Sequence, residues 1–92
     1  MPLLNPQEVA SRLRALPSWQ VEKGELTRTF SFKDFQAALR FVNQVGQQAE
    51  AAGHHPDIDI RYNKVRLSLT THSAGGLTEK DFDLAAAADG LA

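Results

Sequence analysis

The segment DIDIRYNKVRLSLTTH, residues 57 to 72, contains two successive runs in which apolar and polar side chains alternate. The apolar positions of the two runs are Ile58, Ile60, Tyr62, Val65, Leu67 and Leu69. A period of two is typical of half-buried strands. Asn63-Lys64, between the runs, suits a two-residue hairpin turn because asparagine tolerates a positive φ. The sequence therefore predicts an antiparallel hairpin with one apolar face.

A second hairpin is expected over residues 19–32, where Lys23-Gly24 marks the turn between two alternating runs. Arg28 falls on the apolar side of the second run, which indicates a position near an end or an interface.

Helix signals surround the two hairpins. Asn5 and Glu8 form a capping-box pattern around Pro6, and Thr78 and Asp81 repeat it near the end of the chain. Between them a long helix is expected over residues 33–52, ended by Gly53. Its apolar positions are Phe35, Ala38, Leu39, Val42, Val45, Ala49 and Ala52. The order α-ββ-α-ββ-α predicts a single α+β domain over residues 1–92, with a four-stranded antiparallel sheet and three helices packed on one face.

Composition narrows the class of protein. A chain of 92 residues makes one domain with a thin core, so self-association is a natural supplement. Its ten basic and eleven acidic residues argue against a nucleic-acid surface. No apolar run approaches the roughly 20 residues that span a bilayer, and the N-terminus lacks signal-peptide features. Without cysteine, disulfides and thiolate chemistry are excluded, and we expect a cytoplasmic protein.

The three histidines occur in one region of the predicted fold. His54 and His55 join the long helix to the first strand of the 57–72 hairpin, and His72 ends its second strand. Counting from a turn at residues 63–64 places residues 57 and 70 opposite each other, which brings His72 beside the 54–55 step. Glu50 lies one helical turn before His54, where a carboxylate opposes the helix dipole and needs a compensating partner. These residues predict a convergent cluster of imidazoles.

Two kinds of chemistry fit such a cluster. Three histidines and a carboxylate could hold zinc in a metal-dependent hydrolase, but neighbouring residues of an extended chain point to opposite sides and rarely share one ion. Metal-free acid–base catalysis suits imidazole, which gives and takes protons near neutral pH. No phosphate-binding loop is recognisable, so a nucleotide cofactor is not expected. Individually, Asp81 could be only a helix cap and Glu50 only a solvated residue. Without outside information, Trp19 is interpreted as a core residue. The aromatic residues Phe35, Phe41 and Phe82 are assigned to the core and not to a cofactor site.

The spacing of the polar residues resembles a family signature. Glu50, His54-His55-Pro56, Tyr62, His72 and Asp81 occur at the intervals found in the pterin-4a-carbinolamine dehydratases, which in animals also act as dimerization cofactors of a homeodomain transcription factor. The stretches around residues 30–41, "YNKV", "TH" and "GLTxxDxxLA" extend the resemblance over the chain from Trp19 onward.

The resemblance implies dehydration of a 4a-hydroxytetrahydropterin to a quinonoid dihydropterin without a cofactor or metal, in a homodimer or homotetramer. It implies catalytic roles for His54, His55 and His72. It also implies a pterin pocket formed by the residues Glu50, Gly53, Thr70, Thr71, Ser73, Asp81 and Trp19. Glu50 would orient a histidine or hold the polar edge of the ring, and backbone groups at Gly53 and at residues 70, 71 and 73 would line the pocket.

The chain departs from the animal-type pattern at two positions. Gly53 replaces an aspartate before the histidine pair, and Lys80 replaces an arginine before Asp81. The first departure removes a polar contact that the resemblance would otherwise imply. Because animal members also bind a protein partner, a non-catalytic protein-binding module is the alternative function.

Overall fold

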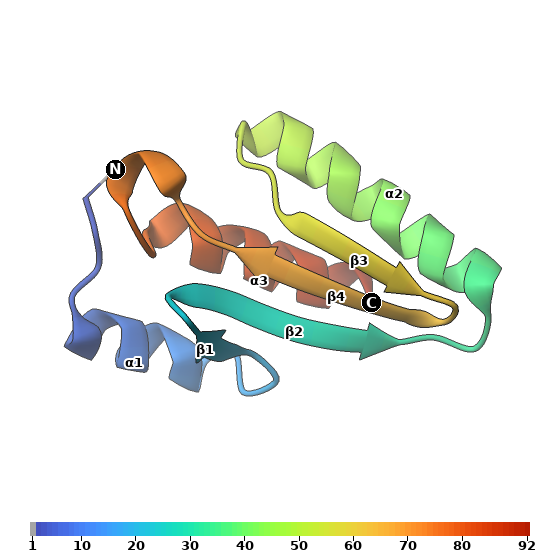
Figure 1. Ribbon diagram of the computed structural model, residues 1–92, viewed down its shortest axis with the longest axis horizontal. Coiled ribbons are helices and arrows are strands. Elements are labelled where there is room, and N and C mark those ends of the chain that lie inside the picture. Colours follow the sequence, from blue (N-terminus) through green and yellow to red (C-terminus); the bar gives the residue numbers. More distant parts are fainter. Residues whose placement is uncertain (1) are drawn as a thin grey trace.

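The computed structural model describes residues 2–92 as one sheet with helices against it (Figure 1). In chain order the elements are α1 (Pro6–Arg14), β1 (Gln20–Glu22), β2 (Glu25–Ser31), α2 (Phe35–Ala52), β3 (Asp57–Arg61), β4 (Lys64–Leu69), a short 3-10 helix η1 (His72–Ala74) and α3 (Glu79–Leu91). All strand pairs are antiparallel, in the order β1-β2-β4-β3. The predicted α+β class and element order are confirmed. None of the helices in residues 2–92 is long and apolar enough to cross a membrane.

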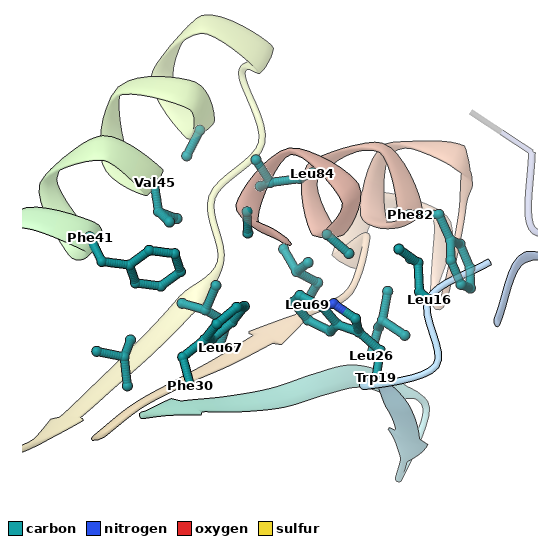
Figure 2. Close-up of a cluster of buried hydrophobic side chains, with 14 of the residues drawn as sticks. Leu16, Trp19, Leu26, Phe30, Phe41, Val45, Leu67, Leu69, Phe82 and Leu84 are labelled. Atoms are coloured by element: carbon teal, nitrogen blue, oxygen red, sulfur yellow. The ribbon is translucent and has the colours of Figure 1, made fainter. Parts of the chain in front are cut away.

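The hydrophobic core lies between one face of the sheet and the helices α2 and α3 (Figure 2). Its buried members in the strands are Leu26, Phe30, Val65, Leu67 and Leu69, and those in the two helices include Ala38, Phe41, Val45, Ala49, Phe82, Leu84, Ala85 and Ala88. The strand residues occupy alternate positions, as the period of two requires. The opposite face carries polar side chains such as the cross-strand neighbours Thr29, Arg66 and Asp59.

The helix ends follow the sequence signals closely. Asn5 accepts a hydrogen bond from the Glu8 amide and Glu8 returns one to the Asn5 amide, so the predicted capping box of α1 is present. Asp34 caps α2, which therefore begins at Phe35 rather than at residue 33. Arg12 of α1 bonds Glu79 at the start of α3, and this hydrogen bond raises the pKa of Arg12.

The turn of the β3–β4 hairpin lies one residue earlier than predicted. Arg61 pairs with Lys64, so Tyr62 and Asn63 form the turn, and Tyr62 adopts a φ of 54°. Asp57 consequently faces Ser68 and not residue 70. Asn63 is used differently than expected, since its side-chain amide donates to the Phe32 carbonyl at 2.8 Å and holds the hairpin tip against the end of β2.

Part of the predicted apolar stripe of α2 lies outside the core. Phe35 and Leu39 expose 45% and 37% of their surface, and Ile58 on the neighbouring edge strand β3 exposes 38%. The assignment of Phe35 to the core was wrong. Phe41, on the other side of the helix, is 2% exposed and packs against Phe30 with 4.6 Å between ring centroids.

Arg28 lies where the sheet meets the C-terminal part of α3. Its guanidinium donates to Asp89 at 2.6 Å and lies over the Phe30 ring, 4.1 Å from the centroid. Trp19 is 5% exposed and donates its indole N–H to the same Asp89 oxygen at 2.8 Å. A carboxylate on α3 therefore explains why a cation occurs on the apolar side of β2.

Candidate active site

The end of α2 fixes the backbone of His54. Gly53 takes the left-handed conformation with a φ of 62°, and its N–H returns to the Glu50 carbonyl at 3.2 Å. The His54 N–H reaches the Ala49 carbonyl at 3.1 Å, which completes a Schellman-type helix end. Pro56 then favours extended backbone at His55 and directs the chain into β3. The sequence Gly-His-His-Pro thus fixes the backbone conformation around His54, and with it the position from which its side chain extends.

The imidazole of His54 contacts the buried carboxylate of Asp81. The Nε2 atom of His54 lies 2.6 Å from Oδ1 of Asp81, and the two side chains are 10% and 0% exposed. Asp81 comes from the first turn of α3, where a negative charge is favoured by the helix dipole. The sequence suggested a capping role or a pocket wall for Asp81; the structure adds a direct contact with His54.

The other carboxylate oxygen is held by two threonines. Oδ2 of Asp81 accepts from the Thr78 amide at 2.9 Å and from the Thr71 hydroxyl at 2.8 Å. The hydroxyls of Thr71 and Thr78 are themselves 2.8 Å apart. Among the described residues, no buried side-chain nitrogen or oxygen lacks a partner. The sequence predicted Thr78 as a helix cap but not its hydrogen bond to Thr71 in this network.

His72 lies on a tight turn that begins at Thr71. The Thr71 carbonyl accepts hydrogen bonds from the amides of Ala74 and Gly75, both at 3.0 Å, and the Thr71 amide donates to Gly76 at 2.9 Å. His72 and Ser73 are exposed on this turn, and Thr70 before it is half-buried. Because Thr71 and His54 contact the same carboxylate, the turn that carries His72 lies beside His54.

His55 has a different environment from its neighbour. Its Nε2 atom lies 2.6 Å from Oε1 of Glu50, and both side chains are largely exposed, at 63% and 79%. This pair lines one end of an open groove of about 880 Å³ between α2 and β3, with Val42, Gly46, Pro56 and Ile58 among its other lining residues. Glu50 therefore contacts a histidine, as expected, but that histidine is His55.

The predicted site residues fall into three places. In the first place, Asp81 contacts both His54 and Thr71. The predicted site residues close to these two in the sequence are Gly53, Thr70, His72 and Ser73. Glu50 and His55 form the second place, at the groove. Trp19 is in the core and bonds Asp89, which lies eight residues, or roughly 12 Å, along α3 from Asp81. Within residues 2–92, no three His, Asp or Glu side chains form a group that could hold a metal ion.

Sequence comparison assigns the family. A sequence model described as "Pterin 4 alpha carbinolamine dehydratase" matches residues 2–91. The chain belongs to this family. It is 57% identical over 91 residues to a protein of Acidobacterium capsulatum, covering 99% of both chains. It is 62% identical over 89 residues to one of Chloroflexus aurantiacus, covering 97% of this chain and 96% of the other. Both relatives carry pterin-4-alpha-carbinolamine dehydratase as a provisional name.

Two solved structures share the fold. A transcriptional coactivator/pterin dehydratase from Brucella melitensis superposes with a TM-score of 0.95 at 39% identity, covering 98% of each chain. A pterin dehydratase-like protein identified as a RuBisCO assembly factor in the alpha-carboxysome gives a TM-score of 0.65 at 24% identity, over 79% of this chain and 84% of that one. The second likeness is one of fold alone.

Proposed function

We propose that this protein dehydrates 4a-hydroxytetrahydropterins to quinonoid dihydropterins by histidine acid–base catalysis, and so supports tetrahydropterin recycling. Family membership supports a pterin carbinolamine dehydratase activity. The observation that carries the catalytic part is the buried His54–Asp81 pair beside the turn of His72. A cytoplasmic location stays a prediction from the sequence.

The reaction needs two proton transfers and no redox step. The N5–H proton leaves, the electron pair forms the N5–C4a double bond, and the 4a-hydroxyl takes a proton and departs as water. One imidazole that accepts and one that donates satisfy this balance. A well-placed acid or base contributes roughly 10² to 10⁴ in rate.

The contact with Asp81 favours His54 as the base. An ionised carboxylate only accepts hydrogen bonds, so the Nε2 atom of His54 carries its proton toward Asp81. The lone pair of the neutral ring is then on Nδ1, which can take the N5 proton. His72 is assigned as the acid for the departing hydroxyl, and the Glu50–His55 pair assists at the groove, where it can bind a polar edge of the pterin.

The test is dehydration of a synthetic 4a-hydroxytetrahydropterin, followed by ultraviolet absorbance against the spontaneous reaction. The proposal expects His54→Ala and His72→Ala to lower kcat by roughly 10²-fold or more. Asp59→Asn, on the polar face of the sheet, is the control and keeps the wild-type rate. Unchanged rates in both histidine variants would end the acid–base assignment.

We also propose that the chain forms a homodimer or homotetramer. The exposed Phe35 and Leu39 of α2 and Ile58 of β3 support this, because apolar side chains gathered beside an edge strand are typical of an interface. A second copy of the chain is the proposed occupant of this apolar surface.

A non-catalytic protein-binding role is the second candidate. It is favoured by the Brucella melitensis relative, which is described as both coactivator and dehydratase. If this role is the main one, a variant without histidines retains the partner in a pull-down although dehydration is lost. If partner capture needs the histidines, the protein-binding role is not independent of the site.

A further inference from the structure

The carboxylate of Asp81 is enclosed by donors from three parts of the chain. Its side chain is 0% exposed, and it accepts from His54 on one oxygen and from Thr71 and the Thr78 amide on the other. A buried carboxylate without such partners would be strongly destabilising. The positions of these donors therefore decide how the carboxylate plane is turned.

The direction of each hydrogen bond in this network follows from the donors available. With Asp81 ionised, the single hydroxyl proton of Thr71 points to Oδ2. Thr71 then has only lone pairs left for Thr78, so the Thr78 hydroxyl donates to Thr71. The Thr78 oxygen in turn accepts from the Lys80 amide at 3.3 Å. The chain of protons runs in one direction from the cap of α3 to the carboxylate.

We propose that Thr71 is a positioning residue that fixes the tautomer of His54 through Asp81. Its hydroxyl occupies Oδ2 together with the Thr78 amide and so keeps Oδ1 turned toward His54, and the imidazole is held with its proton on Nε2 and its lone pair on Nδ1. Metal-binding histidines are oriented by outer partners in a comparable way, through the hydrogen bond of the ring nitrogen that does not bind the metal. The consequence for catalysis rests on the proposed function, since Nδ1 is the nitrogen assigned to take the N5 proton.

Thr71 also begins the turn that carries His72. Its carbonyl accepts from the amides of Ala74 and Gly75, while its side chain reaches Asp81. One residue therefore sets the ring of His54 by its side chain and the backbone of His72 by its main chain. A side-chain substitution separates these functions because it leaves the main-chain bonds available.

The experiment reads the tautomer directly by long-range ¹H–¹⁵N NMR of the imidazoles, with the three histidines assigned from single variants. In the wild type, we expect His54 in the Nε2–H form and a Thr71 hydroxyl proton that exchanges slowly. Thr71→Val keeps the shape and removes the hydroxyl, and is expected to give a mixture of tautomers. Thr71→Ser restores the wild-type form. Thr29→Val, on the exposed face of β2, is the matched control and changes neither signal.

Two results would overturn the proposal. The first is a wild-type His54 protonated on Nδ1, or a wild-type Thr71 hydroxyl proton that exchanges as fast as that of Thr29. Both observations are made on the wild-type protein, so they test the proposal even if Thr71→Val does not fold. The other is a folded Thr71→Val that keeps the pure wild-type tautomer.

Kinetics separate this proposal from the proposed function. Thr71→Val is expected to lower kcat about tenfold with KM unchanged, less than the loss of an acid or base itself, and Thr71→Ser to recover it. If the wild type does not accelerate dehydration but its tautomer responds to Thr71, the function fails and the positioning role stands. If dehydration is accelerated and the tautomer ignores Thr71, only the positioning role fails.

Discussion

Asp81 contributes to both the stability of α3 and the orientation of His54. Its Oδ2 atom completes the capping box with the Thr78 amide, while Oδ1 contacts the imidazole. The capping pattern was readable in the sequence because it depends on residues three positions apart. The contact with His54 was not readable, because it joins positions 27 residues apart that meet only when α2 and α3 pack together.

Replacing Asp81 by asparagine should therefore harm both stability and catalysis. An amide has one oxygen and one NH₂ group, so either a donor around it faces another donor, or His54 moves its proton to Nδ1 and accepts from the NH₂ group on Nε2. We expect Asp81→Asn to lower the free energy of unfolding by about 1 to 3 kcal/mol. We also expect slower dehydration. Urea unfolding and the absorbance assay measure the two effects. Asp59→Asn, the same chemical change at an exposed position, should alter neither, and equal behaviour of the two variants contradicts the network described.

Gly53 explains one departure from the animal-type pattern. Its φ of 62° favours glycine, but aspartate and asparagine tolerate this conformation better than other residues, and a Cβ added there meets no heavy atom within 4 Å. An aspartate thus fits the same helix end, and we expect the backbone of His54 to be the same with either residue.

Substitutions at this position should rank by backbone preference. Gly53→Val is expected to lower the free energy of unfolding by about 1 to 2 kcal/mol, and Gly53→Asp by less. Urea denaturation measures both. Gly90→Ala, where the added Cβ also has open space but the backbone is helical, should not destabilise. A valine variant as stable as wild type would show that the left-handed conformation is not required.

At the scale of elements, hydrophobic alternation predicted the strands but not the hairpin register. A turn at residues 63–64 instead of 62–63 shifts each cross-strand partner by two positions, from residue 70 to Ser68 opposite Asp57. A shift of two leaves every side chain on its original face, so a period of two cannot distinguish the alternatives. The deciding contacts are tertiary, in particular the bonds that join Asn63 to Phe32 on β2.

The backbone of this turn is strained at Tyr62, and a substitution can relieve the strain. Tyr62 has a φ of 54° and exposes 68% of its surface, so its side chain contributes little packing. A non-glycine residue in this conformation carries a strain of about 1 to 2 kcal/mol, which a glycine would remove. Part of this gain is offset, because glycine has a greater entropy in the unfolded state. We expect Tyr62→Gly to raise the free energy of unfolding by up to about 1 kcal/mol, measured by urea denaturation. A clear loss of stability would contradict this prediction and would show that the strain at Tyr62 is smaller than the entropy cost of glycine.

At the scale of the whole molecule, the sequence could not distinguish the internal core from exposed apolar surface. Phe35 and Leu39 share the helical period of Ala38 and Val45, yet only the latter pair is buried by the sheet. Periodicity indicates that one face of a helix is apolar. It does not indicate whether the sheet of the same chain or another molecule covers that face. The proposed association of two or more copies would cover the remaining side of α2 and the edge strand β3.

A charge introduced on this surface should separate the copies. We expect Leu39→Asp to shift the mass measured by light scattering after gel filtration toward that of a monomer. Val21→Asp is the matched control, because Val21 on β1 is 39% exposed compared with 37% for Leu39. A wild-type protein that is already monomeric at high concentration would refute the association.

The burial of Trp19 has a practical consequence. It is the sole tryptophan of the chain, and its indole touches an aromatic ring of β2 and a carboxylate of α3, so its fluorescence depends on the sheet and the C-terminal helix remaining together. Ultraviolet emission from this one indole should therefore move to longer wavelength when that contact opens, which gives an intrinsic optical signal for unfolding without any added dye.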